Sequence, residues 1–207
     1  MSTERRVAAV IPVASLERAK SRLGENLDPE ERRDLVLGLL GRVLEAARGT
    51  HGIWRTYVVS PDEDVARIAA EAGAVPVRQA NYGLNQGLEE ARAVALADGA
   101  DALLVLPGDL PQVSPAAIAD VLDVLDRTAP PVVAIVPDRH GRGTNALLLA
   151  PPGVIDFAFG GDSRAAHRQA AEAVCTDVIE LDGPLGLDVD TPEDLLLVQS
   201  TVAPVDG

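Results

Sequence analysis

Short apolar runs alternate along the chain with longer stretches in which apolar residues recur every three or four positions. The run Val7–Val13 predicts a strand, and Pro29–Arg48, with its leucines and valines on one face, predicts a helix. Further strands are expected over Trp54–Ser60, Ala74–Arg78, Ala102–Leu106, Pro131–Val136, Asn145–Leu149 and Asp177–Leu181. Further helices are expected over about 60–72, 84–98, 114–127 and 163–173, and a last helix from Thr191 onward. This alternation predicts an α/β fold with a mostly parallel sheet and helices on both faces.

Composition supports that fold and narrows the classes of function. Hydrophobic residues make up 47% of the 207 residues but aromatic residues only 2%, so the core is expected to consist of Val, Leu, Ile and Ala. We find no internal repeat and no linker, which predicts one domain over residues 1–207. The net charge of -14 argues against a nucleic-acid partner or an anionic membrane surface.

The single cysteine and the absence of long apolar segments set further limits. Cys175 is alone, which excludes an internal disulfide and a multi-cysteine zinc site. No signal peptide and no apolar run of membrane-spanning length is visible, so a cytoplasmic protein is expected. In open sheets of this kind ligands bind at the carboxyl ends of the strands, so the loops after Val13, Leu106, Val136 and Leu181 are the candidate sites.

The loop after the first strand contains Lys20, the one lysine among 18 Lys and Arg residues. An ammonium group is a compact point charge that suits a phosphate oxygen, whereas a guanidinium group clamps planar anions. A single lysine in an arginine-rich chain also arises by chance. Arg22 lies two residues further along the same loop.

Two rigid turns carry aspartates. Asp109 is the only charged side chain in the turn Pro107–Pro111, and a carboxylate fixed at a strand end suits Mg²⁺ bound to triphosphate oxygens. It could instead bond its own backbone. In the second turn Asp190 or Thr191 can cap the last helix, but capping does not explain Asp188. An acidic pair of the glycosyltransferase type is an alternative, although such pairs usually lie mid-chain.

Three polar segments are candidates for binding an anion or a nucleotide. Gly143, Thr144 and Asn145 offer N–H groups and a hydroxyl, although a hairpin loop would need no such function. Gly160, Gly161 and Ser163 precede a helix, whose free N–H groups bind anions, and His167 is expected to face that anion or the solvent. Asn81–Gly87 could contact a purine or ribose, with Asn85 as a helix N-cap in the simpler interpretation, and His140 is expected to be solvent-exposed.

Together these motifs resemble the 2-phospho-L-lactate guanylyltransferase family of coenzyme F-420 biosynthesis, whose actinobacterial members act on phosphoenolpyruvate. The matching segments are Leu16–Leu23, Gly83–Asn85, Gly108–Pro111, Asp138–Leu147, Phe159–Ser163 and Gly186–Asp194. They span nearly the whole chain, and Gly-Thr-Asn-Ala-Leu at 143–147 is the most specific. The family's pattern has a lysine where this chain has Ala14. The resemblance implies a single three-layer α/β/α, Rossmann-like nucleotidyltransferase domain.

The resemblance also implies a reaction and a set of roles. The phosphate of a phospho-acid attacks the α-phosphorus of GTP and expels pyrophosphate, so no general base is required. Asp109 and Asp188 would hold Mg²⁺, with Asp190 as a reserve ligand. Lys20 and Arg22 would neutralise the triphosphate. Thr144, Gly160 and Ser163 would hold the carboxylate of the acid, and Asn85 would contact the nucleotide, as would Lys20.

Other functions remain open at this stage. A molybdopterin nucleotidyltransferase shares the expected fold, but its glycine-rich first loop is missing, because Pro12–Gly24 contains no glycine before Gly24. A catalytically silent nucleotide-binding protein is the second alternative. Phosphoenolpyruvate, 2-phospho-L-lactate and 3-phospho-D-glycerate all fit the same anion site; the arginine- and alanine-rich composition, typical of a GC-rich bacterium, favours phosphoenolpyruvate. A labile product is compatible with handover to a downstream transferase.

Overall fold

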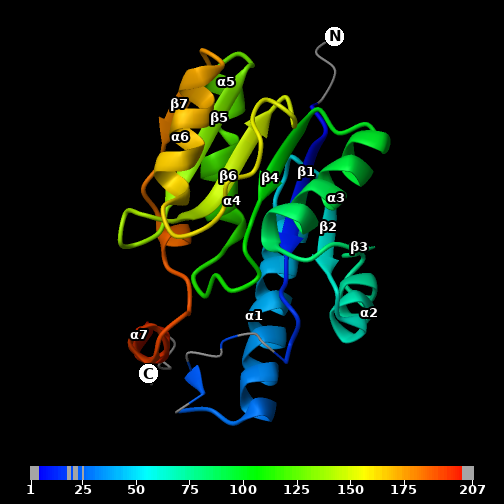
Figure 1. The fold of residues 1–207 in the computed structure, drawn as a ribbon, viewed down its shortest axis with the longest axis vertical. Helices are drawn as coiled ribbons and strands as arrows, with labels where there is room; N and C mark the ends of the chain where they lie inside the picture. Colours follow the sequence, from blue (N-terminus) through cyan, green and yellow to red (C-terminus); the bar gives the residue numbers. More distant parts are fainter. Residues whose placement is uncertain (1–4, 18–19, 21–22, 25, 202–207) are drawn as a thin grey trace.

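The computed structural model describes residues 5–17, 20, 23–24 and 26–201, and for residues 197–201 only the backbone course of the last helix (Figure 1). Its strands are β1 (Val7–Pro12), β2 (Ile53–Ser60), β3 (Val75–Arg78), β4 (Ala102–Val105), β5 (Val132–Pro137), β6 (Thr144–Ala150) and β7 (Asp177–Glu180). Its helices are α1 (Pro29–Gly49), α2 (Glu63–Glu71), α3 (Leu84–Ala97), α4 (Pro115–Leu122), α5 (Val124–Arg127), α6 (Ser163–Ala173) and α7 (Pro192–Thr201), with a 3-10 turn, η2, at Pro184–Gly186.

The seven strands form one sheet in the order β3-β2-β1-β4-β6-β5-β7. Four of the six strand pairs are parallel, as expected, and the two pairs that involve β6 are antiparallel. Leu147 on β6 lies opposite Val105 on β4 and Ile135 on β5. Because β6 runs against its neighbours, its first residues, and not its last ones, lie at the carboxyl edge of the parallel strands.

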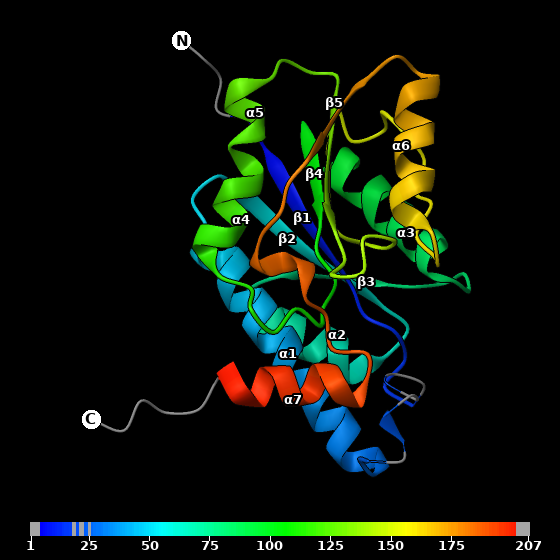
Figure 2. The same cartoon turned by 90° about the vertical axis from the view of Figure 1, so that its left-hand side faces the viewer.

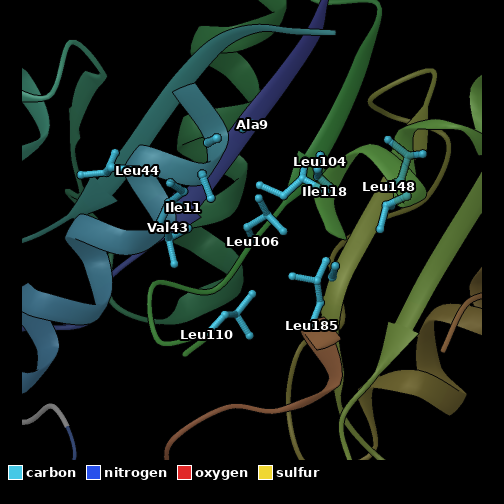
Figure 3. Close-up of a cluster of buried hydrophobic side chains, with 14 of the residues drawn as sticks. Ala9, Ile11, Val43, Leu44, Leu104, Leu106, Leu110, Ile118, Leu148 and Leu185 are labelled. Carbon is cyan, nitrogen blue, oxygen red and sulfur yellow. The ribbon is translucent and has the colours of Figure 1, made fainter. Parts of the chain in front are cut away.

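Helices cover both faces of the sheet, so the fold has three layers (Figure 2). The alternation of side chains along β1 shows how the two cores divide: Ala9 and Ile11 face one cluster, and Ala8 and Val10 face the other. The first cluster includes side chains of α1, α2, α4 and α5, and the second includes side chains of α3 and α6. Figure 3 shows part of the first cluster, with Val43 and Leu44 of α1 and Ile118 of α4. Both cores consist mainly of Val, Leu, Ile and Ala, as composition predicts.

Local sequence explains where several helices begin. Asp28 caps α1 by accepting the N–H of Glu31 at 2.9 Å, and the Glu31 carboxylate accepts the Asp28 N–H at 2.8 Å in a capping box. Ser114 caps α4 as expected, accepting the N–H of Ala117 at 3.1 Å. The helix expected over 114–127 is divided into α4 and α5 at Asp123. None of the helices in the described part of the chain is long and apolar enough to cross a membrane.

Candidate active site

The turn after β4 places Asp109 beside the loop that follows β1, at the lower end of the sheet in Figure 1. Gly108 makes this close approach possible. A Cβ atom at Gly108 would lie 3.1 Å from Cγ2 of Val13, so the valine side chain would have to move to make room for it. The glycine therefore lets the aspartate turn pack directly against the end of β1.

Lys20 connects that loop to both acidic turns. Its backbone has a φ of 55°, a left-handed conformation that costs a non-glycine residue about 1–2 kcal/mol. Its side chain is 7% exposed, and the ammonium binds Oδ2 of Asp109 and, at 2.8 Å, Oδ1 of Asp190. Burial alone would lower the pKa of Lys20, but the two carboxylates outweigh it and raise the pKa above its usual value. Lys20 is therefore a fixed positive charge.

Asp188 lies near Asp109 and Asp190, the two carboxylates that bind this ammonium. Burial, followed by the charges of Asp109 and Asp190, raises the pKa of Asp188. The Asn145 amide lies 3.5 Å from Oδ1 of Asp188 and gives it only a long hydrogen bond. Oδ1 of Asp109 is buried and has no hydrogen-bonding partner among the described residues. The cluster therefore carries more negative charge than Lys20 neutralises.

These carboxylates fit a divalent cation in charge and in donor type. Magnesium prefers carboxylate oxygens, and the orphaned Oδ1 of Asp109 is a buried acceptor without a donor. The described residues contain no ready-made cluster of three or more acidic, histidine or cysteine side chains at metal-binding geometry. Lys20 accounts for this, because its ammonium already lies between Asp109 and Asp190.

Asp194 stabilises the second acidic turn, at 186–194. This role was not predicted from the sequence, where Asp194 is one of two acids in the first turn of a helix. Oδ2 of Asp194 accepts the N–H groups of Asp190 at 3.0 Å and Thr191 at 2.7 Å, and the Thr191 hydroxyl at 2.8 Å. Thr191 caps α7 in return, accepting the Asp194 N–H at 3.3 Å. Oδ1 lies 2.6 Å from Nη2 of Arg139, which comes from the loop between β5 and β6. Asp194 thus joins the two loops on either side of the carboxylates.

Thr144 and His167 form a buried pair, so the expectation that His167 faces an anion or the solvent is wrong. The His167 side chain is completely buried. Its Nε2 accepts the backbone N–H of Ala158 at 3.0 Å, which places the ring proton on Nδ1, 3.1 Å from Oγ1 of Thr144. Burial lowers the pKa of His167 to about 4, so the ring is neutral at physiological pH. The Thr144 oxygen accepts this proton and keeps its own O–H to donate.

Ser163 and Gly160 lie at the start of α6, as predicted, but the backbone N–H groups there already have acceptors in the protein. Asp162 is the N-cap residue and Ser163 is the first helical residue, 2% exposed. The N–H of Ser163 donates to the Gly160 carbonyl at 3.3 Å, and that of Arg164 donates to the Arg142 carbonyl at 3.0 Å. Two N–H groups that we expected to be free are therefore engaged within the protein.

Asn85 does not cap α3; the N-cap residue is Gly83. The Asn85 side chain instead pairs with the backbone of Phe159, accepting its N–H at 2.9 Å and donating to its carbonyl at 3.1 Å. This pair ties α3 to the loop that leads into Gly160 and Ser163. Its assignment as a nucleotide contact stays a prediction, as do the substrate-binding roles of Thr144, Gly160 and Ser163. Arg22 lies outside the described residues, and His140 is exposed as expected.

A pocket of about 370 Å³ opens beside the carboxylate cluster, at the carboxyl ends of β1, β2 and β3. It is lined by Pro12, Val13, Ala14, Ser15, Val59, Pro61, Gln79, Ala80, Asn81, Tyr82, Gly83, Leu84 and Gly87. Its volume lies within the range of small-molecule sites, about 300–1,000 Å³. Ala14, where the family pattern has lysine, is part of its wall. The loop 81–87 was predicted from the sequence to contact a nucleotide, but Gln79 was not, because its only signal is its position directly after β3.

The sheet order, the three layers and the acidic cluster at the carboxyl edge define a nucleotidyltransferase of the nucleotide-diphospho-sugar transferase type. In agreement, a structure described as a putative nucleotide-diphospho-sugar transferase from Desulfovibrio desulfuricans superimposes with a TM-score of 0.76, at 18% identity, over 98% of this chain and 90% of that one. The family model "Guanylyl transferase CofC like" matches residues 7–199, and the chain belongs to this family.

Two curated relatives support the same assignment. A protein named phosphoenolpyruvate guanylyltransferase from Rubrobacter xylanophilus is 46% identical over 196 residues, 94% of each chain. A protein of the same name from Sphaerobacter thermophilus is 44% identical over 189 residues, 90% of this chain and 89% of the relative. The chain is therefore a guanylyltransferase, as its motifs predicted, and the molybdopterin and silent-protein alternatives are set aside.

Proposed function

We propose that this enzyme transfers GMP from GTP to the phosphate of phosphoenolpyruvate and releases pyrophosphate, in the biosynthesis of coenzyme F-420. The observation that carries the proposal is the Lys20–Asp109–Asp190 cluster with Asp188, at the sheet edge of a chain 46% identical to a relative of that name. GTP as a substrate agrees with a cytoplasmic location. The product is a labile phosphoanhydride, which suits delivery to a downstream transferase.

In this proposal an oxygen of the substrate's phosphate forms a bond to the α-phosphorus of GTP while the bond from that phosphorus to the bridging oxygen of pyrophosphate breaks. The nucleophile is already an anion, so no side chain needs to remove a proton. His167 agrees with this, because the neutral ring is buried and already hydrogen-bonded at both nitrogens. Catalysis then depends on positioning and on charge neutralisation.

We assign Mg²⁺ to Asp109 and Asp188, with Asp190 as a further ligand; bound there, Mg²⁺ would neutralise charge on the triphosphate. A cation at this position would compete with Lys20 for the carboxylates, which would leave the ammonium available to phosphate oxygens together with Arg22. The Thr144 hydroxyl, whose oxygen already accepts from His167, would donate to the carboxylate of the acid, and Ser163 and Gly160 would complete that site. Asn85 would act indirectly, by holding the backbone of Phe159 in the loop that leads to Gly160 and Ser163.

Pyrophosphate release tests the proposal directly. The purified protein would be incubated with GTP, Mg²⁺ and one acid at a time: phosphoenolpyruvate, 2-phospho-L-lactate or 3-phospho-D-glycerate, with a downstream transferase added to consume the product. We expect the highest kcat/KM with phosphoenolpyruvate. A higher kcat/KM with another acid would identify that acid as the substrate in place of phosphoenolpyruvate. If none of the three acids led to pyrophosphate release, the proposed reaction would be refuted.

A further inference from the structure

One side chain in the 370 Å³ pocket has a fixed orientation that the reaction described above does not explain. Gln79 follows β3 directly, and its backbone N–H donates to the Ser60 carbonyl at 3.0 Å. Its Nε2 donates to the carbonyls of Asn81 at 2.6 Å and Gly83 at 2.7 Å. Both partners are acceptors, so the amide nitrogen must face them. The carbonyl Oε1 is left as an acceptor, and no described residue donates to it.

Gly87 provides the space for this amide. A Cβ atom at Gly87 would lie 2.9 Å from Cδ and 3.0 Å from Oε1 of Gln79, too close for either group to stay in place. Glycine inside a helix costs about 0.5–1 kcal/mol relative to alanine, and Gly87 lies inside α3. The contact with Gln79 is a physical reason for a glycine at this position.

The loop that holds Gln79 is itself rigidly bonded. The Glu90 carboxylate accepts the backbone N–H groups of Ala80 at 2.8 Å and Asn81 at 2.9 Å, and these bonds lower its pKa. The Asn81 carbonyl is thereby presented to Gln79 in a fixed place. An acceptor that is already oriented before a ligand binds loses little entropy on binding, which favours selective recognition.

The pocket adjoins the catalytic cluster and suits a flat heterocycle. Val13 lines it and also lies against Gly108, next to Asp109. Val59 and Leu84 add apolar wall for the faces of a base. Along its Watson–Crick edge guanine presents two neighbouring donors, N1–H and the 2-amino group, whereas adenine presents the N1 acceptor there.

We propose that Gln79 determines the choice of nucleotide: its Oε1 accepts from the N1–H and 2-amino edge of the guanine of GTP. This inference rests on the proposed function in that it takes GTP as the nucleotide bound beside the carboxylate cluster. Adenine would place an acceptor against Oε1 and leave both without a donor, so ATP is rejected. A site that hydrogen-bonds one base discriminates strongly against a base that lacks the donors.

The test compares GTP and ATP in wild-type enzyme and in Gln79→Ala, with affinities from equilibrium dialysis in Mg²⁺ buffer without any acid. We expect the affinity of Gln79→Ala for GTP to fall about tenfold, and its affinity for ATP to stay unchanged or to rise. The ratio of the GTP affinity to the ATP affinity should therefore fall by at least about tenfold. Gln86→Ala is the matched control, because this glutamine lies in the first turn of the neighbouring helix α3 and does not line the pocket. Its ratio should equal that of the wild type.

Gly87→Ala provides a second route to the same outcome, because it keeps Gln79 but displaces its amide. General damage to the loop would weaken both nucleotides alike and leave the ratio unchanged. A wild-type ratio in folded Gln79→Ala, or a wild-type protein that does not prefer GTP, would overturn the inference. The dialysis measurement needs no phospho-acid. A failure to turn over phosphoenolpyruvate would therefore refute the proposed reaction, and the dialysis would still show whether Gln79 selects GTP over ATP.

Discussion

At the scale of single residues, the active-site charges favour function over stability. Asp188 lies close to Asp109 and Asp190, and burial together with these two charges raises its pKa. An acid whose pKa is raised on folding destabilises the native state at any pH where it is ionised in the unfolded chain. The protein therefore retains a carboxylate that opposes its own folding, as is common where a site must attract a cation.

This conflict predicts opposite effects of Asp188→Asn on stability and on activity. Without metal the variant should unfold at a higher urea concentration than the wild type at pH 7, because Asn keeps the size and the acceptor that faces Asn145 but removes the charge. Its kcat should fall by at least about 100-fold. Asp177→Asn, on an exposed residue at the start of β7, should change neither quantity. An Asp188→Asn enzyme that is less stable or fully active would contradict the explanation.

His167 predicts a dependence of stability on pH. In the unfolded chain this histidine binds a proton below about pH 6.5, whereas in the native state burial delays protonation until about pH 4. Between these values the unfolded state binds more protons, so the free energy of unfolding should fall as the pH falls, by roughly 3 kcal/mol in total. Urea titrations at pH 7, 5.5 and 4.5 measure this slope.

His167→Gln should lose this part of the slope, because glutamine does not titrate. His140→Gln is the matched control, since His140 is exposed and lies outside the core. If both variants show the wild-type slope between pH 6.5 and 4, the destabilisation at low pH has another origin than His167.

At the scale of secondary-structure elements, the β5–β6 loop and the turn before α7 act as one unit. Arg139 comes from the loop and Asp194 from the first turn of α7, and their ion pair at 2.6 Å leaves the Asp194 side chain 4% exposed. The same carboxylate binds the backbone at Asp190. A change in the loop should therefore reach Asp190, one of the carboxylates that we propose as Mg²⁺ ligands, through Asp194.

Arg139→Gln should destabilise the protein by about 1–3 kcal/mol, because it removes the positive charge that pairs with the nearly buried Asp194 carboxylate. It should also raise the Mg²⁺ concentration for half-maximal activity by about tenfold, because the turn that carries Asp190 loosens. Arg142→Gln is the control in the same loop: its pair with Asp162 at 3.0 Å is mostly exposed and should contribute less than about 1 kcal/mol. Equal effects of the two variants would show that the buried pair has no special role.

Elements and their order were predictable from the sequence because they depend on local periodicity and caps. The helix Ser163–Ala173 was placed at its observed bounds, and β1 to within one residue. The direction of β6 was not predictable, because an apolar run has the same pattern in either direction. The break at Asp123 also lacked a signal, since no glycine or proline marks it.

Site residues were predictable from the sequence where a rigid turn fixes their position. They were less predictable where contacts with residues far away in the sequence determine their surroundings. Lys20, Asp109 and Asp190 were each singled out from their turns, but the ion pairs between them were not predicted, because the motifs assigned Lys20 to the triphosphate. The environment of His167 was mispredicted because its partner Thr144 lies 23 residues away on a strand of unknown direction. The role of Asp194 was not predicted, because the preference of acidic residues for the first turn of a helix already explained its position.

At the scale of the whole molecule, the net charge of -14 is a cost to folding. Like charges repel most strongly in the compact state, and salt screens them over a Debye length that shortens from about 30 Å at 0.01 M to about 10 Å at 0.1 M. In metal-free buffer at pH 7, raising NaCl from about 0.01 to about 0.1 M should raise the Tm by about 2–4 °C. Near the pI of about 4.5 the same change should have little effect. A Tm that falls with salt at pH 7 would contradict this account.

The contact between Lys20 and Asp190 spans 170 positions of the chain, and it has a consequence for the order of events during synthesis. The sheet gains its last strand at Glu180, before Asp188 and Asp190 have been added. A growing chain can therefore complete its scaffold while Lys20 and Asp109 still lack their partners. In the proposed function, the sites for the cation and for GTP are therefore complete only once the turn at 186–194 folds back onto the loop that follows β1.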